Sequence, residues 1–361
     1  PPLMSVPFDQ PDLALPQALA ALSQPVDAVL AVDDHGQALA ARLRVALGLP
    51  GNPPAAVARL ADKLRFRELQ SLLGLPCPDF AVVDAGTIDP ASLPAYPVVV
   101  KARRLNASRG VIRADDDAQL AQAAQRVRRI QARAQREADA LLVERFLPGV
   151  EVALDGVLHD GVLSVLAVFD KPDPLDGPYF EETLYVTPSR LPTATQATFA
   201  DSVQSLCVAA GVTEGVIHAE ARVNDAGVWL LEIAPRGIGG LCGRVLAATL
   251  GMGSAEIVLR HAVGLPLPAA SHEAAAGVMM IPIPLAGILR GVDGVAAARA
   301  VPGITGVEIT AQRGQLVAPP PEGAGYLGFL FAHAATPAAV ESALRAAHAA
   351  LTLDIQALVE P

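Results

Sequence analysis

The stretch that decides the fold is residues 216–236, VIHAEARVNDAGVWLLEIAPR. Two apolar runs flank a turn-forming cluster at 224–227, and this pattern predicts a β-hairpin. Side chains alternate between the two faces of a strand, and pairing around this turn brings Glu220 close to Glu232. We therefore expect two carboxylates to meet on adjacent strands.

Carboxylates within apolar sequence are costly to bury unless they are paired or bind a cation. Oxygen ligands suit Mg²⁺, which binds one or two carboxylates together with substrate phosphates. Arg236, just beyond the second strand, carries the planar donor group that clamps a carboxylate or a phosphate. From these residues alone, two exposed glutamates on a solvated sheet face stay open as the alternative to a metal site.

Basic residues earlier in the chain mark a second candidate site. Lys63 lies at a helix, and Lys101 ends a buried strand at 98–100, a position from which a lysine can face phosphate. The small, basic loop at 102–111 can fold over phosphates through its backbone N–H groups. The alternatives are ordinary surface lysines and an exposed turn.

A third signal is LLVERFLPG at 141–149, an apolar strand that runs into a connector and is followed by Glu151. Backbone groups of such a connector can bind the edge of an adenine, while a carboxylate binds ribose hydroxyls. Taken alone, the motif is weak.

The remaining pattern predicts alternating helices and strands first, then antiparallel hairpins. Strands are expected at 28–32, at 80–83 and on both sides of a turn at 160–161. Helices are expected at 37–47, 55–73, 115–140, 193–210, 241–263 and 337–351. The fold class is therefore α/β and α+β, with several domains.

Composition excludes several classes of protein. With 37 acidic against 27 basic residues, the net charge of −10 disfavours nucleic-acid binding, and 52% hydrophobic residues disfavour disorder. The longest apolar stretch, 277–289, contains two prolines and is too short to span a membrane. Three widely spaced cysteines indicate reduced thiols and a cytoplasmic protein. The seven histidines show no zinc-type spacing, so His159 and His261 are expected to be surface or packing residues.

In their order and spacing, these motifs resemble the ATP-grasp superfamily over roughly residues 26–266. The resemblance implies an ATP-grasp fold with an N-terminal wound α/β domain and a small C-terminal α+β domain. The implied domains are 1–61, which we expect to be incomplete, 62–267, with a lid at about 94–146, and 268–361.

The resemblance also assigns roles to residues. It implies that ATP is bound by Lys63, Lys101, Ser108, Gly110, Glu144, Arg145, Phe146, Leu147 and Glu151. It implies that Mg²⁺, or Mn²⁺ in its place, is bound by Glu220 and Glu232. The implied catalytic residues are Arg236, Lys101 and Arg109. Contacts to substrate are implied for Lys171, Glu181, Glu182, His218, Arg236, Gly239 and Gly240.

One position departs from the commonest superfamily pattern. Many members carry Asn two residues after the second metal glutamate, where this chain has Ala234. The bacterial L-amino-acid ligases also tend to carry a small residue there, and the segment after 268 resembles their C-terminal domain. The substitution leaves open which group, if any, serves as a third metal ligand.

The implied activity is that of an ADP-forming carboxylate–amine ligase that works through an acyl phosphate. Its expected partners are an L-amino acid or other carboxylate and a second amino acid or amine, with no nucleic acid and no membrane. The sequence leaves open whether the protein forms a homodimer. The alternatives are an enzyme of the purine-biosynthetic or biotin-carboxylase type, and an ATP-binding module without catalysis.

Overall fold

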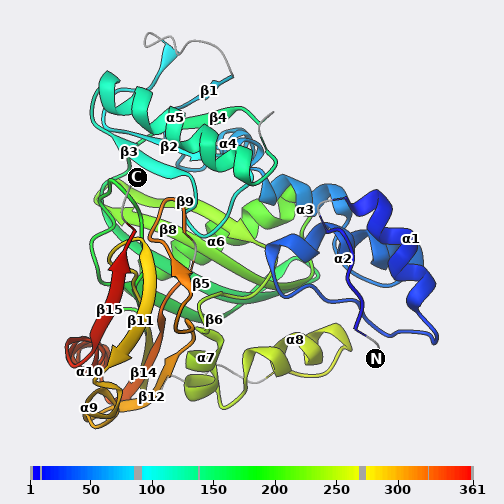
Figure 1. Ribbon diagram of the computed structural model, residues 1–361. Coiled ribbons are helices and arrows are strands. Elements are labelled where there is room, and N and C mark those ends of the chain that lie inside the picture. The colour runs from blue at the N-terminus through cyan, green and yellow to red at the C-terminus, as the bar shows by residue number, and fades with distance from the viewer. Residues whose placement is uncertain are drawn as a thin grey trace.

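The computed structural model describes residues 3–8, 10–84, 92–136, 139–267, 274–323 and 325–358. Within these residues the strands form three sheets, of four, eight and three strands. In Figure 1 the four-stranded sheet lies at the top and the eight-stranded sheet crosses the centre, with the N-terminal helices to its right. None of the helices in the described part is both long and apolar enough to cross a membrane.

The N-terminal part is helical, with α1 (Pro11–Ala21), α2 (Asp34–Leu47), α3 (Pro54–Ala61) and α4 (Lys63–Leu72). The strand predicted at 28–32 is wrong, because no neighbouring strand is present to pair with it among the described residues. Side chains of α2 bind its backbone instead, with Arg44 Nε donating to the Val29 carbonyl at 2.8 Å.

The single helix predicted at 55–73 is also wrong, since it breaks at Asp62. This residue has extended backbone angles, and its carboxylate accepts a hydrogen bond from the Leu64 amide at 3.0 Å. The same carboxylate pairs with Arg103 at 3.1 and 2.7 Å. The break makes Lys63 the first residue of α4.

The four-stranded sheet has the strand order β1-β4-β2-β3, and α5 packs against it. Its strands are β1 (Phe80–Val83), β2 (Val98–Ala102), β3 (Val111–Ala114) and β4 (Leu141–Arg145). Helix α5 (Asp117–Arg133) is shorter than the predicted 115–140 at both ends. It begins later because the Asp116 side chain caps its first turn, and it ends before Ala134, whose backbone angles are no longer helical.

The eight-stranded sheet has the order β12-β14-β10-β7-β6-β5-β8-β9. Its strands are β5 (Val150–His159), β6 (Val162–Lys171), β7 (Leu184–Thr187), β8 (Gly215–Asn224), β9 (Gly227–Ala234), β10 (Ala275–Ile281), β12 (Ile304–Ile309) and β14 (Gly328–Ala334). Both predicted hairpins, with turns at 160–161 and 224–227, are confirmed. Strands on either side of the predicted domain boundary at 267/268 share this sheet, and the boundaries themselves stay a prediction.

Different helices cover the two faces of this sheet. Alternate residues of β5 point to opposite sides, and Val152 and Leu154 pack with α6 (Thr193–Ala210), as predicted at 193–210. Ala153 packs with α7 (Gly243–Leu250) on the other face. The helix predicted at 241–263 is divided, because Gly251 ends α7 with a left-handed φ of 68° before α8 (Ser254–Ala262) begins.

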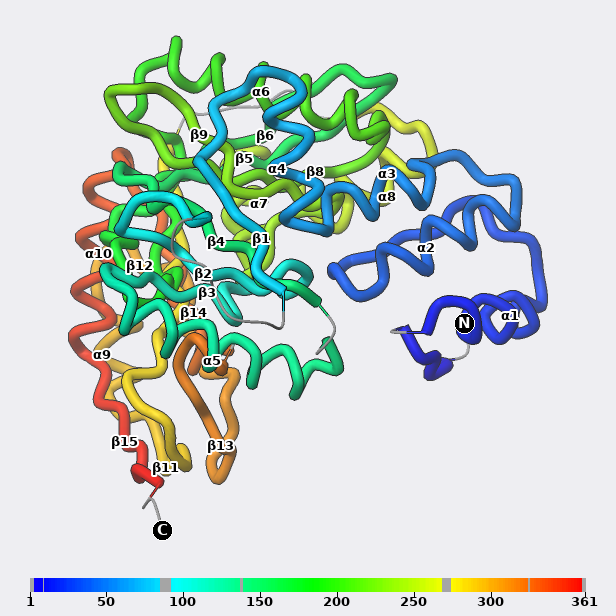
Figure 2. The backbone as a smooth tube through the Cα atoms, turned by 90° about the horizontal axis from the view of Figure 1, so that it is seen from above, coloured from blue at the N-terminus to red at the C-terminus, as the bar shows by residue number. Residues whose placement is uncertain are grey.

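The C-terminal part adds the sheet β13-β11-β15 and two helices. These elements are β11 (Gly287–Asp293), α9 (Val295–Arg299), β13 (Leu316–Val317), α10 (Pro337–Ala349) and β15 (Thr352–Ala357). The closing helix is thus confirmed, and it packs on β10 and β14. Figure 2 shows this part on the side of the molecule opposite α1 and α2.

Candidate active site

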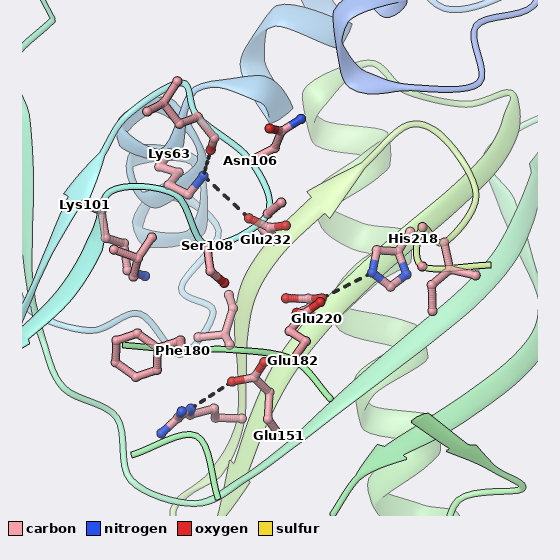
Figure 3. A pocket seen from close by; sticks show the side chains of 18 of the residues that line it. Lys63, Lys101, Asn106, Ser108, Glu151, Phe180, Glu182, His218, Glu220 and Glu232 are labelled. Carbon is pink, nitrogen blue, oxygen red and sulfur yellow. Dashed lines mark hydrogen bonds and ion pairs between the residues drawn. The ribbon is translucent and has the colours of Figure 1, made fainter. Parts of the chain in front are cut away.

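A cavity of about 260 Å³ lies between the four-stranded and the eight-stranded sheets. We call it the central cavity; Figure 3 shows residues that line it. Most of the predicted site residues line it, namely Lys63, Lys101, Ser108, Glu144, Arg145, Phe146, Leu147, Glu151, Glu182, His218, Glu220, Glu232, Arg236, Gly239 and Gly240. Residues separated by up to 177 positions, from Lys63 to Gly240, therefore face one space.

The two predicted metal carboxylates are direct neighbours. Glu220 on β8 pairs with Glu232 on β9 in the strand register, and a β-bulge follows immediately. Glu232 lies 3.6 Å from the Lys63 ammonium, measured from Oε2 to Nζ. The predicted proximity of the two carboxylates is confirmed, and their oxygens are the donor type that Mg²⁺ prefers.

The buried Lys171 forms ion pairs with Glu220 and with two other carboxylates. The Lys171 ammonium lies 2.8 Å from Glu151, 2.7 Å from Glu182 and 2.8 Å from Glu220. Burial lowers the pKa of Lys171, but the three carboxylates raise it well above its ordinary value. Burial likewise raises the pKa of Glu220, yet Lys171 and His218 hold it below the usual value. Lys171 is not among the residues that line the central cavity, and its expected contact with substrate stays a prediction.

His218 forms a second charged contact with Glu220. Its Nδ1 lies 3.1 Å from Asp155 and its Nε2 lies 3.3 Å from Glu220. Burial lowers the pKa of His218, but the two carboxylates raise it to about 9. Asp155 also accepts a hydrogen bond from the Ile238 amide at 3.2 Å, which anchors the glycine-rich loop beside the cavity. Sequence reasoning missed Asp155, whose one signal is a carboxylate inside an apolar strand.

The lysines at the four-stranded sheet have different partners. Lys101 Nζ lies 2.5 Å from a Glu144 oxygen, whereas Lys63 Nζ donates to the Leu105 carbonyl at 2.7 Å. Arg67 donates to both oxygens of Glu144, at 2.7 and 3.0 Å. Burial raises the pKa of Glu144, but Arg67 and Lys101 bring it down to about 2. The Glu144 carboxylate is thus already engaged by two cations.

Arg67 is a buried residue next to the cavity that the sequence analysis did not single out. Its side chain is 1% exposed, and it also donates to the Leu230 carbonyl at 3.0 Å. Its only sequence signal is a charged residue among the helical positions of 55–73. It links α4, the four-stranded sheet and β9, so it positions Glu144 and Lys101.

The connector after β4 forms an aromatic wall of the cavity. Phe146 stacks with Phe180, with ring centroids 6.5 Å apart. The Arg222 guanidinium lies 5.0 Å from the Phe146 centroid and 3.2 Å from Glu151, and it donates to the Leu147 carbonyl at 2.7 Å. A planar, apolar surface next to a fixed carboxylate suits a nucleoside. Phe180 and Arg222 had no site role in the sequence analysis.

The loop between β2 and β3 presents Ser108 to the cavity. Neither Arg109 nor Gly110 lines it. The Arg109 guanidinium donates to Asn106 at 3.2 Å, while its Nε is buried without a hydrogen-bond partner among the described residues. Gly110, at φ 65°, donates its amide to the Pro321 carbonyl at 3.2 Å, which ties the loop to the C-terminal part. The roles expected for Arg109 and Gly110 stay predictions.

The far end of the cavity contains Arg236 and the glycine-rich loop. Arg236 donates to both oxygens of Asp34, at 2.7 and 2.8 Å. Gly240 has a left-handed φ of 58°, and a Cβ there would meet the Met280 sulfur at 2.4 Å. Glu181 lies apart from the central cavity, in a small adjoining cavity of about 10 Å³. Its expected contact with substrate stays a prediction.

Comparisons with known proteins agree with this geometry. Residues 94–245 match the ATP-grasp domain family, and residues 279–356 match the L-amino acid ligase C-terminal domain 2 family. The protein therefore belongs to the ATP-grasp superfamily, with a C-terminal part of the L-amino acid ligase type. The predicted superfamily and fold class are confirmed.

Individual relatives fall in the same superfamily. Carnosine synthase 1 of Gallus gallus is 33% identical over 285 residues, which cover 73% of this chain and 30% of the relative. D-alanine–D-alanine ligase of Syntrophotalea carbinolica is 29% identical over 48% of this chain and 54% of the relative. The chain thus spans between about a third and a half of these proteins. The crystal structure of an L-amino acid ligase from Bacillus licheniformis matches with a TM-score of 0.83 and 24% identity, covering 97% of this chain and 86% of that one.

Proposed function

We propose that this protein is an ADP-forming ligase that activates the carboxylate of an L-amino acid and joins it to a second amino acid or amine. The observation that carries the proposal is the pair Glu220 and Glu232, which lines one cavity together with Lys63, 3.6 Å from Glu232, and with Arg236. The ATP-grasp and L-amino acid ligase matches support the nucleotide and the substrate class.

The residues present fit a magnesium ion. Glu220 and Glu232 supply carboxylate oxygens from paired strands, and Lys171 neutralises part of the charge on Glu220 without entering the cavity. Bound there, Mg²⁺ would neutralise negative charge on the phosphate oxygens of ATP. Ala234 supplies no ligand atom from its side chain, so the donor set from this hairpin is two carboxylates.

The nucleotide fits against the connector and the lysines. Phe146 and Phe180 would hold the adenine, and Glu151, fixed by Lys171 and Arg222, would bind the ribose hydroxyls. Lys63 and Lys101 would bind phosphate oxygens. Ser108 would cover the phosphates from the loop, which Gly110 ties to the C-terminal part.

The chemistry has two steps. A carboxylate oxygen of the amino acid attacks the γ-phosphorus of ATP, and the bond to the β-phosphate oxygen breaks to give an acyl phosphate and ADP. The free amine of the second substrate then attacks the acyl carbon, loses a proton and expels inorganic phosphate. Arg236 would stabilise the oxyanion that forms at this carbon, because its guanidinium is oriented by Asp34.

The charges near the cavity suit amino-acid substrates. Arg236 and His218 offer positive charge to a carboxylate, while Glu182 offers a carboxylate to an ammonium group. Burial and the neighbouring Glu220 raise the pKa of Glu182, which therefore can also accept a proton from an attacking amine.

A grid of amino-acid pairs tests the proposal. Phosphate release from Mg²⁺-ATP is measured for each pair, dipeptides are detected by mass spectrometry, and hydroxylamine is added to trap an acyl phosphate as a hydroxamate. We expect phosphate release that needs an amino acid and a matching product mass. Glu308→Gln, at a part-exposed glutamate outside the cavity that pairs with Arg244, is the active control. ATP binding without any amino-acid-dependent phosphate release would favour a non-catalytic module, and bicarbonate-dependent release would favour the carboxylase type.

A further inference from the structure

Three side chains with metal-binding atoms meet on a part of the fold away from the central cavity. His159 ends β5, Glu214 precedes β8, and His261 lies in α8. One ligand atom from each lies within 4.8 Å of the others, and none of the three residues lines the central cavity. Their separation along the chain explains why sequence spacing gave no zinc signal.

The distances between these ligand atoms fit tetrahedral coordination of a metal ion. Glu214 Oε2 lies 3.4 Å from His159 Nδ1 and 3.4 Å from His261 Nε2. Zinc bonds to His and Glu of about 2.0–2.2 Å, arranged tetrahedrally, separate neighbouring ligand atoms by roughly 3.3–3.6 Å. An ordinary N–H···O hydrogen bond is shorter, at about 2.7–3.2 Å. The distances therefore match ligands around an ion better than a direct hydrogen bond.

The central ligand is held in place by other groups. Glu214 Oε1 accepts the Asp160 amide at 2.8 Å, which leaves Oε2 for the two histidines. Asn52 clamps the backbone, because its Nδ2 donates to the Glu214 carbonyl at 2.6 Å and its Oδ1 accepts the Glu214 amide at 3.0 Å. Asn52 is only 6% exposed. Hydrogen bonds that fix the position of a metal-binding residue are typical of metal sites in proteins.

We propose that His159, Glu214 and His261 bind a divalent transition-metal ion, with zinc as the preferred ion, at a site separate from the Mg²⁺ proposed for ATP. Two imidazoles and a carboxylate are a known zinc donor set that leaves a fourth position for water. The ion would join α8 to the ends of β5 and β8. Because α8 buries only Ile257, this link would fasten a lightly packed helix to the main sheet.

The test is binding of Zn²⁺ and Co²⁺ to the full chain after treatment with a chelator, measured by calorimetry and by the visible absorption of Co²⁺. Excess Mg²⁺ is present throughout. We expect one ion per chain, and a loss of affinity of more than about 100-fold in His159→Ala and in His261→Ala, since loss of a ligand exceeds the outer-shell effect. His333→Ala, at an exposed histidine outside the cluster, is the matched control and keeps full affinity.

The metal affinity of Asn52→Ala shows whether the position of Glu214 matters for binding. We expect a loss of roughly 10–100-fold in affinity, because the backbone of Glu214 is released. Circular dichroism checks the fold of each variant, and the exposed position of His159 makes His159→Ala a mild change. No binding to the chelator-treated protein, or affinity that His159→Ala and His261→Ala leave unchanged, would overturn the proposal and leave Glu214 as an ion-pair partner of two histidines.

Discussion

The carboxylate of Asp34 holds the guanidinium of Arg236 through two hydrogen bonds, 2.7 and 2.8 Å long, across 202 positions of the chain. The same carboxylate accepts a hydrogen bond from Asn106 in the loop between β2 and β3, at 2.8 Å. Burial raises the pKa of Asp34, but Arg236 keeps it below its usual value. Helix α2 thus connects Arg236 with the loop between β2 and β3.

Removing this carboxylate should impair turnover more than folding. In Asp34→Ala, Arg236 loses its fixed orientation, and we expect kcat/KM to fall by about 10- to 100-fold, because small misplacements of a catalytic group are costly. Asp12→Ala removes an exposed carboxylate that pairs with Arg42 on the same N-terminal helices, and it is the matched control. Equal activity of Asp34→Ala and Asp12→Ala would exclude a role for the Asp34–Arg236 pair.

Glu232→Gln should stop ADP formation. Glu232 is part-exposed and pairs only at 3.6 Å with Lys63, so its replacement leaves the fold intact while it removes a proposed Mg²⁺ ligand. We expect the rate to fall by at least about 100-fold, as for loss of one electrostatic group at a phosphoryl-transfer site. Phosphate release and thermal unfolding are measured together. Near-normal turnover would refute the metal assignment.

Replacing Lys171 should mainly lower stability, whereas replacing Lys63 should mainly lower activity. Lys171→Met removes the one buried cation that three carboxylates share, so we expect the free energy of unfolding to fall by about 3–5 kcal/mol. Lys63→Met removes a part-exposed ammonium, and we expect lost ATP turnover with little change in stability. Urea unfolding of both variants checks this; similar stabilities would contradict a structural role for Lys171.

A fall in pH should lower the stability of the fold, because Glu144 becomes protonated. Its pKa is about 2 in the folded protein against an ordinary value of 4.5, because Arg67 and Lys101 outweigh the effect of burial. The stabilisation is present above pH 4.5 and is lost as the pH falls from 4.5 towards 2, by about 3 kcal/mol in total. Glu144→Gln should lose most of this acid dependence in urea unfolding at a series of pH values. The surface variant Glu256→Gln should keep it, since Glu256 forms an exposed pair with Arg260.

The sequence around the turn was enough to predict the hairpin that carries Glu220 and Glu232, but not the β-bulge within it. The turn pairs Asn224 with Gly227, a register that by itself would place Glu220 opposite Leu231. The β-bulge between Glu220 and Ala221 shifts the pairing by one residue and brings Glu232 opposite Glu220. Ser108 and the connector at 144–147 could also be located from adjacent sequence, because their motifs are local. The superfamily resemblance then placed these pieces at one site.

Contacts between distant segments could not be predicted in this way. Asp34 reaches Arg236, and Arg67 reaches Glu144, only because helices of the N-terminal part fold against the two sheets. The strand expected at 28–32 has the right composition, but a strand requires a neighbour and none is present among the described residues. The three carboxylate partners of Lys171 lie on other strands and segments, so sequence pattern could not reveal them, and its expected contact with substrate stays a prediction.

Transfer of ¹⁸O tests carboxylate activation most directly. The amino acid that gives the greatest phosphate release is labelled with ¹⁸O in its carboxylate, and the inorganic phosphate is analysed by mass spectrometry. An acyl-phosphate pathway predicts one ¹⁸O in each phosphate formed, because the carboxylate oxygen that attacks phosphorus leaves with it. Phosphate without ¹⁸O, alongside normal product formation, would contradict it.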